Sequence, residues 1–344
     1  MNSSFPADPR HSLTGLEEAP ALSSTPTLRL LEVSCGLSRA QLEKILRASP
    51  ATPRFSFGGL VALLVLAAGG VYATTNYRLR RLHNVEVRPV AIPADAASIA
   101  RGKHIVTTRS CADCHGADFG GAKVVDDPAA GQLYGPNITR GRGGLPANYS
   151  DLDYVRAIRH GLAQDGRALL LMPSLEYTTL SDEDLGAIVA YLKTVPAVDR
   201  ERGPVQPGPA IRALMVAGQV QLSAEEIDHA AHRPASVAMS VSAEYGKYLA
   251  ASCTGCHGPN LSGGKIPGAP PDWPATANLT PHASSRLPGW NEEQFIATLR
   301  TLKRPDGSSM HPLMPAAIGQ MTDDELKAIW LYLRTLPAAE TGTR

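Results

Sequence analysis

Aromatic residues are scarce in this 344-residue chain, because Phe, Trp and Tyr together make up only 5% of it. A chain of this length predicts about two domains, and so low an aromatic content leaves little bulk for two cores. An excess of one charge is lacking too: 33 Lys and Arg face 32 Asp and Glu, which gives a formal net charge of +1. No overall field therefore favours nucleic acid or an acidic partner, and the cores need another source of apolar bulk.

Cysteine is also rare: the chain has five, and four of them form two copies of one pattern, Cys-x-x-Cys-His, at 111–115 and 253–257. The residues are Cys111, Cys114 and His115, then Cys253, Cys256 and His257. The pattern is typical of c-type haem attachment, in which each thiol adds to one haem vinyl group and the histidine supplies a nitrogen to the iron. A zinc knuckle or a thioredoxin-like redox pair also uses Cys-x-x-Cys, so one copy alone would leave all three open. The fifth cysteine, Cys35, is expected to be an inert thiol.

A methionine follows each pattern at the same distance. Met172 comes 57 residues after His115, Met314 comes 57 residues after His257, and each methionine precedes a proline. A thioether on the open face of a His-ligated haem gives an electron-transfer site and raises its potential. Filling a core is the usual role of such a methionine, but the repeated distance favours both as iron ligands. Two neighbours of Met314 are rival ligands, Met310 and His311.

At these residues the chain resembles the class I cytochrome c family, in a tandem form with two haems. The resemblance covers residues 94 to about 337, with a linker inside, and implies an all-α fold in which a few helices surround each of two covalently bound haem c groups. In that family a backbone carbonyl accepts a hydrogen bond from the proximal histidine. Carried over, Pro136 would orient His115 and Ala277 would orient His257. The haems would also supply the apolar bulk that the aromatic content lacks.

From the first haem motif onward, offsets of 141 or 142 residues relate the two halves, so the halves are expected to be an internal duplication. Gly102 and Gly246 match, each in a helix that runs into a haem motif. A glycine inside a helix costs about 1 kcal/mol, so we expect a packing reason at both positions. The last helices begin with matching capping-box patterns at Ser181 and Thr322.

One uncharged run precedes both halves. Residues 55–77 lie between Arg54 and Arg78 and are long enough to cross a bilayer as a helix. The strongly apolar centre is short, which also fits a cleaved signal peptide and hence a soluble periplasmic protein. The long polar leader favours an uncleaved anchor. Because covalent haem attachment takes place outside the cytoplasm in bacteria, we expect the leader inside and the remainder on the periplasmic side of the inner membrane.

These features predict six segments. They are a polar cytoplasmic leader (1–54), which a start codon placed too far upstream would also explain, a transmembrane anchor (55–77), a tether (78–93), cytochrome c domain 1 (94–197), an interdomain strap (198–242) and cytochrome c domain 2 (243–338).

Two six-coordinate haems would leave no open iron position, so we expect an electron-transfer protein of a respiratory chain rather than an enzyme. Single electrons would pass from a dehydrogenase or quinol-oxidising complex to a terminal oxidase or a soluble cytochrome, with membrane lipid as a further partner. The resemblance extends to the cytochrome subunits of membrane alcohol and aldehyde dehydrogenases, which usually carry three haems where this chain has two motifs. The alternatives are a dihaem cytochrome c peroxidase, in which one haem would lose its distal ligand, and a haem-based sensor that relays a signal through the leader.

Overall fold

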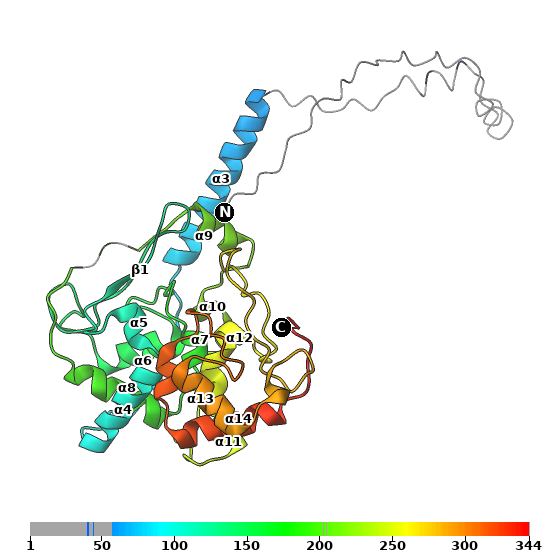
Figure 1. Ribbon diagram of the computed structural model, residues 1–344. Helices are drawn as coiled ribbons and strands as arrows, with labels where there is room; N and C mark the ends of the chain where they lie inside the picture. The colour runs from blue at the N-terminus through cyan, green and yellow to red at the C-terminus, as the bar shows by residue number, and fades with distance from the viewer. Residues whose placement is uncertain (1–39, 41–43, 45–56, 202, 204, 344) are drawn as a thin grey trace, which may run out of the picture. The chain divides into compact units, whose positions relative to one another are not determined.

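The computed structural model describes residues 57–201, 203 and 205–343, together with Ala40 and Lys44 (Figure 1). Almost all of the predicted leader and the first two residues of the predicted anchor lie outside this part, as does Cys35. The chain divides into a unit of residues 1–64 and a unit of residues 65–344, and the tertiary contacts described below all lie within the second unit.

Helix α3 (Phe57–Arg80) covers the predicted apolar run from residue 57 to residue 77 and continues to Arg80. It is the one helix among the described residues that is long and apolar enough to cross a membrane, with a mean hydropathy of 1.9 over its most apolar window and none of that window buried. The C-terminal end of the helix is anchored by polar contacts to α9 (Pro209–Val216). There the Arg212 guanidinium donates to Thr75 Oγ1 (2.7 Å) and to Asn76 Oδ1 (2.9 Å).

The two halves contain matching helices. The first half has α4 (Ala96–Thr108), α5 (Cys111–His115), α6 (Asp151–His160), α7 (Ser174–Tyr177) and α8 (Asp182–Thr194). The second has α11 (Ala243–Ala250), η1 (Ala251–Cys253), α12 (Thr254–His257), η2 (Leu287–Gly289), α13 (Glu292–Thr301), η3 (Ala316–Gln320) and α14 (Asp323–Thr335). Between the halves lie α9 and α10 (Ser223–Glu226).

The first helix of each half crosses the last helix at a glycine. Helix α4 packs against α8, and α11 packs against α14 (Figure 1). A Cβ added at Gly102 would overlap the backbone carbonyl of Ala187, and one added at Gly246 would overlap that of Ala328. The expected packing reason for the two glycines is therefore confirmed: each lets two helix backbones come into direct contact.

The glycine-rich segment after the first haem motif, which reads as a loop in the sequence, contributes two strands to a small sheet. Strands β1 (Ala122–Asp127), β2 (Gly131–Gly135) and β3 (Gln206–Pro207) pair antiparallel in the order β1-β2-β3. The turn between β1 and β2 closes because Asp127 Oδ1 accepts hydrogen bonds from the amides of Ala129 (2.8 Å) and Ala130 (2.7 Å). The fold is thus mostly helical, as predicted, with one small sheet added.

Each half has its own hydrophobic core. The first core includes Val106 and Leu185, and the second includes Leu249 and Leu326. Tyr248 of α11 packs against both. Its hydroxyl donates to the Asp184 carboxylate of α8 at 2.5 Å, so this tyrosine ties the two halves together.

Two candidate haem sites

The first candidate site is built around His115, the last residue of α5. The imidazole is buried and its Nδ1 lies 2.9 Å from the carbonyl oxygen of Pro136. Burial lowers the pKa of His115, an effect that the hydrogen bond to Pro136 opposes without reversing it. A neutral imidazole that donates its Nδ1 proton to this carbonyl keeps the Nε2 lone pair as a metal ligand.

The second candidate site repeats this geometry. His257, the last residue of α12, is also buried, and its Nδ1 lies 2.7 Å from the carbonyl oxygen of Ala277. The proline that precedes the asparagine in the first half is an alanine here, and the distance shows that the bond needs only the carbonyl. The two carbonyls named from the resemblance are thus those that contact the two histidines.

Three of the four thiols that would carry the haems are half-buried, whereas that of Cys256 is exposed. Desolvation raises the pKa of Cys111 to about 12 and that of Cys253 to about 11, and it raises the pKa of Cys114 as well. The positive charge of Arg109 opposes the increase at both Cys111 and Cys253. Among the described residues no group of three or more His, Cys, Asp or Glu could hold a metal ion. The paired thiols and the oriented histidines fit haem c instead.

Each methionine packs against the same core as the first cysteine of its own half. Met172 and Cys111 both lie against the first core, and Met314 and Cys253 against the second. Met310 also packs against the second core, so it stays a rival for Met314. The other rival, His311, is exposed.

Two buried asparagines hold the loops that carry the orienting carbonyls. No role was predicted for either of them from the sequence. Asn137 Nδ2 donates to the carbonyl of Val198 at 2.7 Å, and Asn278 Nδ2 donates to that of Ala339 at 2.7 Å. Each side-chain oxygen accepts from the backbone amide two residues later, at 2.9 and 2.8 Å. The repeated Asn-x-Thr, at 137–139 and 278–280, is the signal from which this clamp could have been predicted.

Two charged side chains of the first half contact the second half, one in the helix before the attachment motif and one in the motif itself. Arg109 Nη1 donates to the carbonyl of Leu249 at 3.1 Å. Glu176 lies against Gly255, inside the second motif, where an added Cβ would overlap its Oε1. Desolvation raises the pKa of Glu176 to about 7, although the charge of Arg109 lowers it.

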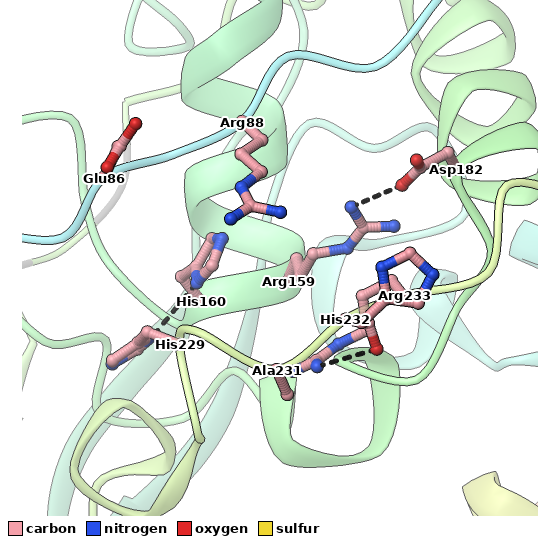
Figure 2. A pocket seen from close by; sticks show the side chains of 9 residues that line it. All are labelled: Glu86, Arg88, Arg159, His160, Asp182, His229, Ala231, His232 and Arg233. Atoms are coloured by element: carbon pink, nitrogen blue, oxygen red, sulfur yellow. Dashed lines mark hydrogen bonds and ion pairs between the residues drawn. The ribbon is translucent and has the colours of Figure 1, made fainter.

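A separate cavity of about 110 Å³ contains none of the residues that the sequence assigned to the haem sites (Figure 2). It is lined by Glu86, Arg88, Arg159, His160, Asp182, His229, Ala231, His232 and Arg233. His160 Nδ1 lies 2.9 Å from His229 Nδ1, and His229 Nε2 donates to the carbonyl of Ala224 at 2.9 Å. Burial and the neighbouring positive charges lower the pKa of His160 to about 4, so its imidazole is neutral.

Comparison with known proteins decides the family. The cytochrome c family model matches residues 99–196 and 243–337, which are the two halves that carry the candidate sites. The chain belongs to the cytochrome c family. The predicted family and the predominantly helical fold are confirmed.

Several relatives are themselves cytochrome subunits. The chain is 29% identical to the fructose dehydrogenase cytochrome subunit of Gluconobacter japonicus, over 75% of this chain and 57% of the relative. It is 27% identical to the gluconate 2-dehydrogenase cytochrome c subunit of Pantoea cypripedii, over 72% and 62% respectively. It thus spans less than two thirds of the length of these two relatives.

A diheme cytochrome c-type protein of Cereibacter sphaeroides matches with 25% identity, over 82% of this chain and 98% of the relative. Two cytochrome c domains and this dihaem relative show that the protein carries two covalently bound haem c groups. The fructose dehydrogenase and gluconate 2-dehydrogenase relatives are named as cytochrome subunits and not as catalytic subunits, which agrees with the electron-transfer role that the sequence predicted.

Proposed function

We propose that this protein is a membrane-anchored dihaem subunit that takes single electrons from a dehydrogenase or quinol-oxidising complex and delivers them to a terminal oxidase or a soluble cytochrome. The observation that carries the proposal is the repeated site: each half has a buried histidine whose Nδ1 lies 2.7–2.9 Å from a backbone carbonyl. A fixed imidazole ring suits electron transfer because the ligand needs little reorganisation when the iron changes oxidation state.

The proposed iron ligands are His115 with Met172 and His257 with Met314. Cys111 and Cys114 would hold the first haem covalently, and Cys253 and Cys256 the second. Bound haem supplies a one-electron carrier whose potential the His/Met pair raises. The domains that hold the two haems extend over 94–197 and 243–338, and the segment 198–242 joins them.

The relatives support a dehydrogenase as the electron donor, because fructose dehydrogenase, gluconate 2-dehydrogenase and alcohol dehydrogenase all occur in their names. Helix α3 supports the anchor by its length and hydropathy. Since haem is attached outside the cytoplasm, the two domains would face the periplasm of a bacterial inner membrane, next to a membrane dehydrogenase. Residues before the helix would stay in the cytoplasm.

The proposal is tested with the full chain, produced in a bacterium that attaches haem c in the periplasm. We expect two haems per chain by mass and pyridine haemochrome, retention in carbonate-washed membranes, and reduction in step with oxidation of a sugar or alcohol by a membrane dehydrogenase in the same vesicles. Rapid turnover of hydrogen peroxide by the reduced protein, measured by stopped flow, would instead point to a peroxidase. Release of the intact protein by the carbonate wash would contradict the anchor.

A further inference from the structure

A carboxyl group of the first domain lies against the second haem motif. Glu176 lies in α7, four residues after Met172, and α7 packs against η1, which contains the first cysteine of the second motif. Its Oε1 lies where a side chain at Gly255 would otherwise be, so only glycine at that place in the motif allows the contact. A side chain of the first domain thereby enters the attachment loop of the second.

The contact between Glu176 and Gly255 has no counterpart in the sequence of the other half. At the offset of 142 residues that relates Met172 to Met314, the counterpart of Glu176 is Ile318, and the counterpart of Gly255 is Asp113. The first motif therefore carries its own carboxylate, which is exposed to solvent, whereas the second motif has a glycine that accommodates a carboxyl group from the other domain. Two otherwise equivalent sites differ in the charge held against them.

The groups around Glu176 show where its charge acts. Arg109 approaches from the end of α4, Tyr177 is its neighbour in α7, and Cys253 belongs to η1. Desolvation has the largest effect on the pKa of the Cys253 thiol and raises it; of the two charges, that of Arg109 lowers this pKa, and the smaller effect of Glu176 raises it. Both charges thus act on the second motif, in surroundings where desolvation strengthens electrostatic interactions.

We propose that Glu176 is a positioning residue of the first domain that holds a negative charge against the second haem and lowers its reduction potential relative to the first. A carboxylate near an iron stabilises the ferric state over the ferrous state, and net charge is one of the factors that tune the potentials of protein-bound iron centres. Because the negative charge favours the second haem as the electron donor, electrons would pass from the second domain to the first. This inference rests on the two haems and ligand pairs proposed above.

The test is a redox titration of the full-length dihaem protein at pH 8, above the pKa of Glu176. The variants are Glu176→Gln, which removes the charge at nearly constant shape, and Gly255→Ala, which displaces the carboxyl group. The control is Glu293→Gln, which removes an exposed carboxylate from α13 of the second domain. Met172→Ala identifies the midpoint that belongs to the first haem.

We expect the midpoint of the second haem to rise in Glu176→Gln and in Gly255→Ala, with a smaller change in the first haem and none in Glu293→Gln. Unchanged midpoints, or equal shifts of both haems, would overturn the role of Glu176 while leaving the dihaem function intact. Loss of a haem by mass from Glu176→Gln would overturn it too, in favour of a role in attachment. A native protein with fewer than two haems would count against the proposed function itself.

Discussion

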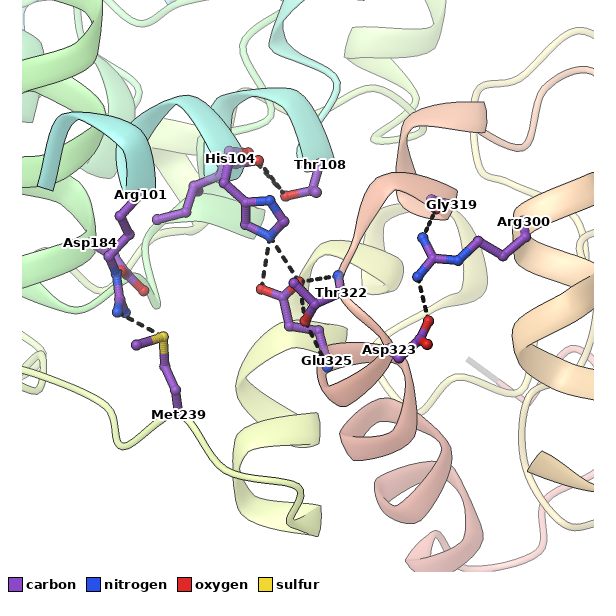
Figure 3. A network of polar contacts seen from close by, with 11 residues as sticks. Arg101, His104, Thr108, Asp184, Met239, Arg300, Gly319, Thr322, Asp323 and Glu325 are labelled. Carbon is purple, nitrogen blue, oxygen red and sulfur yellow. Dashed lines mark hydrogen bonds and ion pairs between the residues drawn. The ribbon is translucent and has the colours of Figure 1, made fainter. Parts of the chain in front are cut away.

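His104 of α4 and Glu325 of α14 form an ion pair that joins the two haem domains, with Nε2 of the histidine 2.8 Å from Oε2 of the glutamate (Figure 3). Glu325 Oε2 also accepts a hydrogen bond from the backbone amide of Thr322 at 2.7 Å, which completes the capping box of α14. The Glu325 carboxylate therefore both caps the N-terminus of α14 and links α14 to α4 of the other domain. Contacts of this kind fix how the two proposed haem sites lie relative to one another.

This pair predicts that docking of the two domains depends on pH. The hydrogen bond to Glu325 raises the pKa of His104, so its stabilising effect is complete below 6.5 and is lost as pH rises through the raised value. Desolvation is the largest single effect on the pKa of Glu325 and raises it, but the hydrogen bonds to His104 and Thr322 together outweigh it, so the pKa is lowered. The contribution of Glu325 to stability is therefore complete above pH 4.5 and is lost as the pH falls through the lowered pKa. We therefore expect the pair to stabilise the docked domains most between pH 4.5 and 6.5, by about 1 kcal/mol.

The measurement is urea unfolding of the native protein and of His104→Gln between pH 5 and pH 9. The native protein should lose stability relative to the variant as the histidine deprotonates, and the two should converge at alkaline pH. Lys103→Gln, at the exposed neighbouring position, is the matched control and should follow the native curve. Parallel curves for native protein and His104→Gln would show that the ion pair does not contribute.

The glycines at the helix crossings allow a sharper test of packing. In Gly102→Ala and Gly246→Ala the new methyl group would overlap the carbonyl of Ala187 or Ala328, which belongs to a helix backbone and cannot rotate away. Overpacking of this kind predicts a loss of about 3 kcal/mol in the free energy of unfolding for each variant. Gly289→Ala, where nothing lies within 4 Å of the added atom, should change stability by less than about 1 kcal/mol. Differential scanning calorimetry of the three variants makes the comparison.

Much of the fold could be predicted because it depends on local signals. Caps, glycines and the repeated offsets place the helices, and the capping box predicted at Thr322 forms with Glu325. At Ser181 the pattern is only half realised, since the Asp184 carboxylate accepts hydrogen bonds from Arg101 and Tyr248. A local rule could not anticipate partners from another helix and another domain.

The candidate sites likewise combine residues that the sequence indicates with contacts that only folding brings together. The candidate histidines, cysteines and methionines could be proposed from spacing, and for the cysteines the reason is that haem attachment fixes the distance between two thiols along the chain. The sheet β1-β2-β3 and the positions of Arg109 and Glu176 depend on segments that meet only after folding. No periodicity in the sequence records that α7 lies against the second attachment motif, so this contact could be found only in the structure.

The histidine pair at the cavity of Figure 2 predicts sensitivity to acid. The pKa of His160 is about 4 in the folded protein, against 6.5 in an unfolded chain, so the unfolded state binds more protons as pH falls below 6.5. We expect the native protein to lose roughly 2–3 kcal/mol between pH 6.5 and pH 4 from this residue. In His160→Asn that part of the acid dependence should disappear, while His282→Asn, a histidine of the second domain, should keep it. Equal acid sensitivity of all three proteins, measured by urea unfolding, would refute the assignment.

The proposed thioether ligands can be tested one haem at a time. A ferric His/Met haem has a near-infrared band that arises from charge transfer between sulfur and iron, so its loss reports the loss of the methionine ligand. We expect Met172→Ala to remove the band of the first haem alone and Met314→Ala that of the second alone, each leaving about half of the native intensity. Met310→Ala and His311→Ala should retain the full intensity if Met314 is the ligand. Loss of half the band from Met310→Ala, with Met314→Ala unchanged, would transfer the ligand role to Met310, which packs against the same core.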